Sequence, residues 1–178
     1  METILIHGKQ FRPFISAQAI RQAVLRLAGT MNKELEGKKP LFIAVLNGSF
    51  IFAADLLREM HMDCELSFVK MASYQGVSSM GQVKELIGMD KDIRGRTVVI
   101  IEDIVDTGLT LEALHTQLSR LGPAEIRTAT LLFKPEAYKK KIKVDYPALE
   151  VPNDFLVGYG LDYDGLGRNL GDIYQAVD

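Results

Sequence analysis

The chain has 178 residues, of which 47% are hydrophobic and 25% charged, a composition typical of one globular domain spanning residues 1–178. Its formal net charge of −2 and pI near 5.9 argue against a nucleic-acid partner, because such proteins present a dense basic surface. The single cysteine, Cys64, excludes an internal disulfide. We find neither a basic leader nor an apolar run of the roughly 20 residues that span a bilayer. We therefore expect a cytoplasmic protein with no membrane partner.

The first part of the chain predicts a helix, a strand and a second helix. Ser16 is a typical N-cap for a helix that we expect to run to about Glu36. Apolar residues recur on one face of this helix at Ile20, Val24, Leu27, Ala28 and Met31. Leu41–Leu46 is a continuous apolar run, typical of a central strand, and Asn47-Gly48-Ser49 makes a turn before an expected helix over Phe50–Met60.

The middle of the chain predicts three strands. Cys64–Ala72 and Val83–Leu86 have strand character, and a polar stretch from Ser73 to Gly81 separates them. Four β-branched residues in a row at positions 98–101 predict a buried strand. Two adjacent carboxylates, Glu102 and Asp103, follow at its expected carboxyl end.

A helix and two further strands complete the pattern. Gly122-Pro123 ends the helix. Leucines at helical spacing mark its inner face: Leu111, Leu114, Leu118 and Leu121. Ile126–Phe133 predicts a strand, and Phe155–Val157 is the last clear one. Strands that alternate with helices predict an α/β fold with a mostly parallel central sheet flanked by helices.

The stretch from Val98 to Thr110 carries the strongest functional signal. Ligands of open α/β sheets bind outside the carboxyl ends of the strands. The turn at 107–110 offers backbone amides and hydroxyls at a helix amino terminus, which suits a phosphate. Carboxylates beside a phosphate repel it unless cations or ligand hydroxyls lie between them. The segment therefore predicts a sugar phosphate together with Mg²⁺, although a buried strand followed by a polar turn is the simpler alternative.

The same stretch resembles the 5-phosphoribosyl 1-diphosphate (PRPP) motif of type I phosphoribosyltransferases. From about residue 43 to 168, the chain resembles the hypoxanthine (6-oxopurine) phosphoribosyltransferases within this family. Four segments carry this resemblance: Leu46-Asn47-Gly48-Ser49, Ser73-Tyr74 with Gly81, the motif itself, and Lys134 with Phe155–Tyr159 and Leu161-Asp162-Tyr163. The resemblance implies transfer of the phosphoribosyl group from PRPP to N9 of hypoxanthine or guanine with Mg²⁺. It also implies a fold with a small hood and a flexible lid loop, and a homodimer or homotetramer.

The resemblance assigns the PRPP-binding residues. Glu102 and Asp103 would bracket the ribose hydroxyls and, with Asp162, hold Mg²⁺; alternatively, one of the pair forms an ordinary ion pair with a lysine or arginine. The loop around the 5-phosphate would consist of Ile104, Val105, Asp106, Thr107, Gly108 and Thr110. Asp106 would also be catalytic, because a carboxylate there can take the proton on purine N7. In relatives that act on adenine or orotate, the residue at the equivalent position resembles alanine. Asp106 in an Asx turn is the structural alternative.

The purine-binding residues are Lys134, Phe155, Leu156 and Asp162 in the same resemblance. Lys134 would hydrogen-bond the purine 6-oxygen, and Phe155 would stack on the base. Backbone groups near Leu156 and Asp162 would read the 2-position. The alternatives are an exposed lysine and a phenylalanine of the core.

Leu46, Asn47, Gly48 and Arg168 would bind the diphosphate, and a cis peptide bond is implied at Leu46–Asn47. Asn47 replaces the lysine of some relatives, so its backbone is expected to do the binding. Arg168 is otherwise a surface residue. Ser73 and Tyr74 would begin the lid, where Met80 replaces the usual serine or threonine before Gly81.

Two other functions compete with this hypothesis. A regulatory protein on the same fold would bind nucleotides and then RNA or DNA, but the acidic pI and the retained Asp106 argue against it. An adenine or uracil phosphoribosyltransferase is disfavoured by Asp106 together with Lys134.

Overall fold

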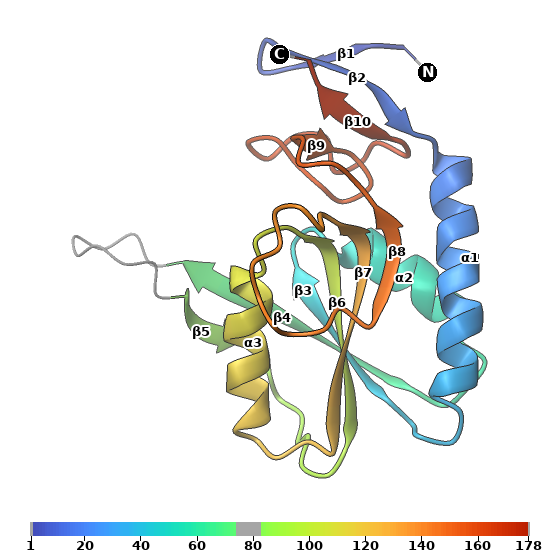
Figure 1. Ribbon diagram of the computed structural model, residues 1–178, viewed down its shortest axis with the longest axis vertical. Helices are drawn as coiled ribbons and strands as arrows, with labels where there is room; N and C mark the ends of the chain where they lie inside the picture. Colours follow the sequence, from blue (N-terminus) through green and yellow to red (C-terminus); the bar gives the residue numbers. More distant parts are fainter. Residues whose placement is uncertain (1, 74–82, 178) are drawn as a thin grey trace.

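A six-stranded sheet forms the larger part of the computed structural model, which describes residues 2–73 and 83–177 (Figure 1). Its strands are β3 (Leu41–Leu46), β4 (Glu65–Ser73), β5 (Val83–Ile87), β6 (Thr97–Val105), β7 (Glu125–Phe133) and β8 (Tyr146–Glu150). They lie in the order β5-β4-β3-β6-β7-β8, and every neighbouring pair is parallel except β4 and β5. The predicted mostly parallel sheet is confirmed.

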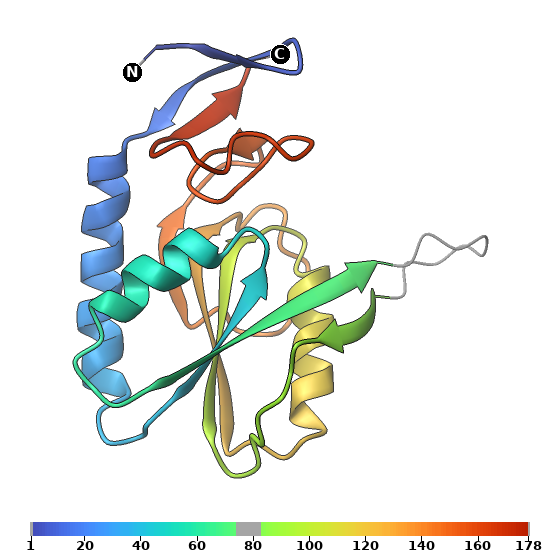
Figure 2. The same cartoon turned by 180° about the vertical axis from the view of Figure 1, so that it is seen from behind.

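Helices cover both faces of this sheet. α1 (Ala17–Glu34) and α2 (Phe50–Arg58) pack on one face, and α3 (Leu109–Ser119) packs on the other (Figures 1 and 2). Ser16 caps α1 as predicted, since its hydroxyl accepts a hydrogen bond of 3.2 Å from the amide of Ala19. The predicted apolar face of α1 is buried throughout. Leu121 was wrongly placed on the inner face of α3, because the helix ends at Ser119 and Leu121 is 48% exposed.

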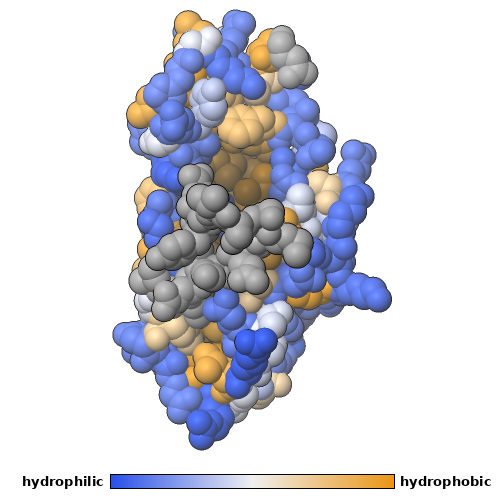
Figure 3. Space-filling model, turned by 90° about the vertical axis from the view of Figure 1, so that its left-hand side faces the viewer, coloured by the Kyte–Doolittle hydropathy of each residue, from blue (hydrophilic) through white to orange (hydrophobic). Residues whose placement is uncertain are grey.

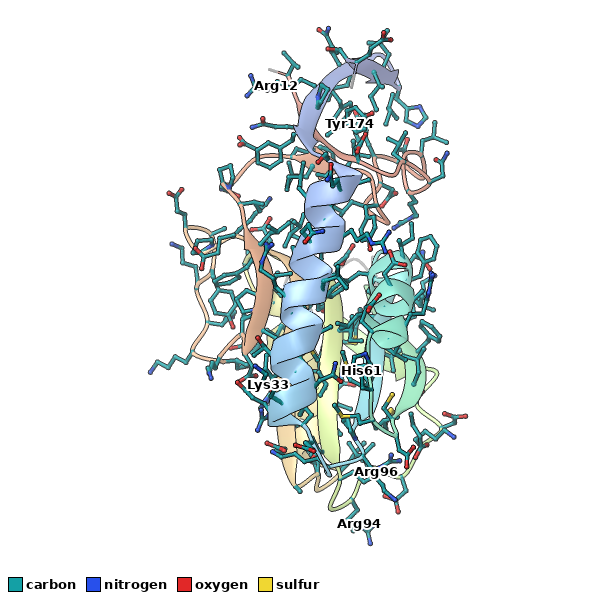
Figure 4. All side chains as sticks on the ribbon, turned by 90° about the vertical axis from the view of Figure 1, so that its right-hand side faces the viewer. Arg12, Lys33, His61, Arg94, Arg96 and Tyr174 are labelled. Atoms are coloured by element: carbon teal, nitrogen blue, oxygen red, sulfur yellow. The ribbon has the colours of Figure 1, made fainter. Side chains whose placement is uncertain are left out.

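A smaller antiparallel sheet, the hood, lies above the carboxyl ends of the parallel strands (Figure 1). It contains β1 (Ile4–Ile6), β2 (Lys9–Ile15), β9 (Leu156–Val157) and β10 (Ile173–Ala176), in the order β1-β2-β10-β9. The sequence analysis did not predict β8 or the hood strands β1, β2 and β10. These strands are short or, in β2, interrupted by Pro13. Figure 4 shows α1 descending from the hood, where Arg12 and Tyr174 lie, toward the opposite end of the sheet, where Arg96 lies.

Strand β6 is longer than predicted, and this difference shapes the site. Its pairing with β7 continues through Glu102 opposite Thr130 and Val105 opposite Phe133. The two carboxylates therefore lie inside a strand, not after its end as expected. The turns that follow β3 and β6 face the hood, and Figure 3 shows a hollow with hydrophobic walls below it. In the part of the chain that the structure describes, no helix is long and apolar enough to cross a membrane.

Candidate active site

The acidic pair, Glu102 and Asp103, lies on β6 at the carboxyl edge of the sheet, where Glu102 is buried and Asp103 is half-buried. Burial and the neighbouring Asp103 raise the pKa of Glu102 well above its usual range. Burial likewise raises the pKa of Asp103 to about 6, although backbone amides and Arg168 oppose the increase. Oε1 of Glu102 is buried with no hydrogen-bond partner among the described residues. Such an acceptor fits a ligand hydroxyl or a cation such as Mg²⁺, because a buried polar atom normally has a partner.

The motif loop, residues 104–110, leads from β6 into α3 and encloses a small cavity of about 90 Å³. Glu102 and every residue predicted for the 5-phosphate loop line this cavity. Gly108 has a φ of +82° at the N-cap of α3, and a Cβ there would meet the ring of Tyr138 at 2.4 Å. Glycine is therefore required both by the backbone and by the close approach of the 138–140 segment. Backbone amides at a helix amino terminus beside a cavity are suited to an anion.

Asp106 and Lys134 form an ion pair at the end of the motif. Nζ of Lys134 lies 3.0 Å from Oδ2 of Asp106. Lys134 follows β7, and its amide donates to the carbonyl of Val105 at 3.0 Å, so the register of β6 and β7 brings the two side chains together. Lys134 is only 7% exposed, which excludes the alternative of an ordinary surface lysine. The Asp106 carboxylate is engaged by this lysine, so the Asx turn does not account for it.

The cis turn, residues 46–49, packs directly against the acidic pair. The peptide bond between Leu46 and Asn47 is cis, as the resemblance implied. A Cβ at Gly48 would lie 1.6 Å from Oδ2 of Asp103, and a Cβ at Gly160 would lie 2.1 Å from the carbonyl oxygen of Gly48. Three segments distant in sequence thus meet at the backbones of two glycines, which the sequence analysis did not foresee.

The third of these segments is the hood loop, residues 158–170. It carries Asp162 and Arg168, whose Oδ1 and Nη2 lie 2.6 Å apart. Both influence the pKa of Asp103, which places them close to the acidic pair. Among the described residues, however, no group of three or more His, Cys, Asp or Glu side chains is gathered to hold a metal ion. Arg168 is half-buried and paired with Asp162, and its role in binding the diphosphate stays a prediction.

Phe155 stands at the edge of the hood and is 46% exposed, so it is not a core residue. Its ring meets that of Tyr163 edge to face, with centroids 5.5 Å apart. Leu156 is buried beside it. Of the predicted lid residues, Ser73 ends β4, whereas Tyr74, Met80 and Gly81 lie outside the described residues.

Sequence reasoning missed a further contact at this site. The hydroxyl of Tyr159, in the hood loop, donates to Oδ2 of Asp55 on α2 at 2.6 Å. The pattern Gly-Tyr-Gly at 158–160 was a signal for an unusual backbone, since all three residues have positive φ. Nothing in the sequence pointed to Asp55 as the partner.

Comparison with known proteins identifies many relatives. A family model described as the phosphoribosyl transferase domain matches residues 15–164. The hypoxanthine-guanine phosphoribosyltransferase of Aquifex aeolicus is 35% identical over 175 residues, covering 97% of this chain and 98% of that protein. The protein of the same name from Lactococcus lactis is 42% identical over 159 residues, covering 88% and 85% of the two chains.

Solved structures agree with these relatives. A hypoxanthine phosphoribosyltransferase variant from Trypanosoma cruzi, in a ternary substrates complex, superimposes with a TM-score of 0.86 at 34% identity, covering 93% of this chain and 94% of that one. A hypoxanthine-guanine phosphoribosyltransferase from Bacillus anthracis, with a HEPES molecule in its active site, gives 0.83 at 35% identity, covering 94% and 97%.

Replacing Asp103 with asparagine should stabilise the ligand-free protein at neutral pH. Folding raises the pKa of Asp103 from 3.8 to about 6, so its proton stabilises the folded state fully below about pH 4, and this contribution is lost as the pH rises through 6. Asp103→Asn should exceed the wild type by on the order of 2 kcal/mol in unfolding free energy above about pH 7, and by little near pH 4. Urea unfolding across this range measures the difference, with the exposed Asp90→Asn as the control. A pH-independent difference would contradict the assignment.

Alanine at position 48 should disrupt the contact between the cis turn and the acidic pair. Its Cβ would overlap the Asp103 carboxylate at 1.6 Å, so Gly48→Ala should lower the unfolding free energy by about 1–3 kcal/mol. Gly29→Ala is the matched control, because no described atom lies within 4 Å of a Cβ at that helical position. That variant should gain about 0.5–1 kcal/mol. Equal melting temperatures for the two variants would show that the turn has room for a side chain.

Proposed function

The chain belongs to the phosphoribosyltransferase family, among its hypoxanthine-guanine phosphoribosyltransferases, and from this membership we propose that it serves purine salvage. It transfers the 5-phosphoribosyl group from PRPP to N9 of hypoxanthine, or of guanine, and yields IMP or GMP and diphosphate. The observation that carries this proposal within the site is the buried Lys134 paired with Asp106 at 3.0 Å, directly beside the motif loop. A cation and a carboxylate held together match the two polar groups on one edge of a 6-oxopurine.

At the base end, Asp106 and Lys134 have separate tasks. The Asp106 carboxylate accepts the proton of purine N7 while N9 attacks the ribose, which makes Asp106 the general base. The Lys134 ammonium has only donors, so it binds the 6-oxygen of hypoxanthine and rejects the 6-amino group of adenine. The exposed ring of Phe155 is available to stack on the base. Backbone groups of Leu156 and Asp162 read its 2-position.

At the other end, the chain binds PRPP through three segments. The motif loop, from Ile104 and Val105 to Thr107, Gly108 and Thr110, surrounds the 5-phosphate with amides and hydroxyls. The acidic pair accepts hydrogen bonds from the ribose hydroxyls and balances the positive charge that develops on the sugar. The cis turn and Arg168 bind the diphosphate.

A magnesium ion fits beside these residues. Mg²⁺ prefers oxygen ligands and keeps several waters, so Glu102, Asp103 and Asp162 would hold it through carboxylates and water. The unpartnered Oε1 of Glu102 supports this assignment. When bound, the ion neutralises negative charge on the diphosphate leaving group.

Three wider features complete the proposal. The lid that the resemblance begins at Ser73 and Tyr74 would exclude water, because water would otherwise hydrolyse PRPP; Tyr74 itself lies outside the described residues. The chain acts in the cytoplasm as one domain over residues 1–178. It assembles as a homodimer or homotetramer, as the resemblance implies.

Substrate choice tests this function directly. The purified protein, incubated with PRPP, Mg²⁺ and one purine base at a time, should form nucleotide with hypoxanthine and with guanine. Adenine lacks the 6-oxygen and leaves the buried Lys134 without an acceptor, so its kcat/KM should be lower by roughly 10⁴-fold. Chromatography of the products with released diphosphate measures both rates. Comparable turnover of adenine would contradict the proposal.

Asp106→Asn should separate chemistry from binding. Loss of a general base typically lowers kcat by about 10²–10⁴-fold, while the Kd for PRPP should change only slightly. Glu112→Gln provides the matched control, since it makes the same carboxylate-to-amide change in a neighbouring carboxylate–lysine pair, with Lys140. Steady-state kinetics and calorimetry distinguish the effects. A wild-type kcat in the Asp106 variant would reduce this residue to a structural role.

A further inference from the structure

The hood loop is rich in glycine and depends on hydrogen bonds for its shape. Within its 158–170 range, four glycines have positive φ, at positions 158, 160, 165 and 167. Glycine has the largest backbone freedom of all residues, and backbone hydrogen bonds within the loop, such as that from Tyr159 to Leu170, hold this segment together. The loop nevertheless carries Asp162 and Arg168, which must face the diphosphate at a defined position.

Hydrogen bonds within the loop join both residues to Gly160. The amide of Gly160 donates to the carbonyl of Arg168 at 3.0 Å, and Nη1 of Arg168 donates back to the carbonyl of Gly160 at 2.7 Å. Nη2 of Arg168 then pairs with Asp162 at 2.6 Å. A displacement of Gly160 would therefore move both charged side chains together.

Gly160 in turn rests on the cis turn, in contact with the carbonyl of Gly48. This contact is between two glycines and has no side chain to fix it. The adjacent Tyr159 supplies the directional attachment, because its hydroxyl donates to Asp55 at 2.6 Å. Asp55 lies on α2, which begins immediately after the cis turn. Burial and the Asp55 carboxylate raise the pKa of Tyr159, so the hydroxyl stays protonated and remains a donor.

The ring and the hydroxyl of Tyr159 are held in different ways. Tyr159 is 7% exposed, and it belongs to the apolar core that also contains residues of α1 and α2. Tyr159 and Asp55 also line a cavity of about 380 Å³ between α1, α2 and the hood loop. Packing therefore holds the ring, and the hydrogen bond to Asp55 fixes the hydroxyl and joins the loop to α2 in one direction.

We propose that Tyr159 and Asp55 are a positioning pair that sets the diphosphate half of the site by tying the hood loop to α2 and the cis turn. The proposal rests on the proposed function and deepens it. The pair acts through Gly160 on Arg168 and Asp162, and it makes no contact with substrate. Asp106 and Lys134, which read N7 and the 6-oxygen, are held by β6 and β7 instead. Loss of the pair therefore weakens binding of PRPP and leaves recognition of N7 and the 6-oxygen intact, and hypoxanthine, which has no substituent at the 2-position, is the base that tests this.

Tyr159→Phe removes the hydroxyl and keeps the ring. The KM for PRPP should rise roughly tenfold, the factor expected for one hydrogen bond to a charged group. The Mg²⁺ concentration for half-maximal rate should rise together with the KM for PRPP. The KM for hypoxanthine should stay within about twofold of the wild type, because a hydrogen bond lost at the diphosphate end does not change the distant base end. Asp55→Asn keeps an acceptor oxygen and should remain close to the wild type. Asp55→Ala should match Tyr159→Phe, and the double variant Tyr159→Phe/Asp55→Ala should be no worse than either.

Tyr146→Phe is the matched control for stability. Tyr146 is also a buried tyrosine whose hydroxyl donates to a carboxylate, Glu34 at 2.9 Å, but on the side of α1 away from the hood loop. The Tyr146→Phe variant should have a lower melting temperature and an unchanged KM for PRPP. If Tyr159→Phe lowers the melting temperature in the same way and leaves both KM values unchanged, the pair is merely structural and the proposal is overturned.

Calorimetric titration with PRPP and Mg²⁺ separates this inference from the proposed function. A wild type that binds PRPP but converts no 6-oxopurine would overturn the function, and the Kd values of the variants would still decide the role of the pair. A wild type that binds no PRPP would overturn both. An active wild type with an unaltered Tyr159→Phe variant would overturn only the pair.

Discussion

The enclosure of two adjacent carboxylates within a central parallel strand constrains the rest of this site. A charge removed from water is unfavourable unless it gains a partner or a proton. For Glu102 and Asp103, folding raises both pKa values, and one Glu102 oxygen is buried without a partner among the described residues. The folded chain is therefore less stable there than an apolar strand would be, and in the proposed function the ligand would supply the missing donors and positive charge. The cis turn approaches the Asp103 carboxylate through Gly48, and the hood loop approaches the cis turn through Gly160, so glycine backbone and not bulky side chains surrounds this part of the site.

The two halves of the site are built by different means. The base end depends on the register between β6 and β7, which brings Asp106 and Lys134 within 3.0 Å on rigid elements. The diphosphate end depends on loops that touch at Gly48 and Gly160. In the proposed reaction, strand ends would give fixed distances for proton transfer, and loops would give the close backbone approach that a highly charged leaving group needs.

Sequence reasoning succeeded where the signal was local. The cap and buried face of α1, the apolar β3 and the motif loop each follow from residues a few positions apart. The cis peptide bond and the hood were expected only from the resemblance. The extent of β6 and the burial of Lys134 could not be predicted, because both depend on pairing with a strand more than twenty residues away. The Tyr159–Asp55 bond spans 104 positions, and no periodicity encodes such a contact.

The strand pairing of the hood also implies an order of folding. Its central pairing joins β2 to β10, with Pro13 opposite Tyr174, so the two strands are separated by nearly the whole described chain. The parallel strands pair over shorter separations, and contacts close in sequence form before distant ones. During synthesis the β1–β2 hairpin emerges before the parallel sheet, and its partner β10 emerges after the sheet. A nascent chain would thus form the motif loop before the hood, and the candidate site would be complete only when β2 and β10 pair.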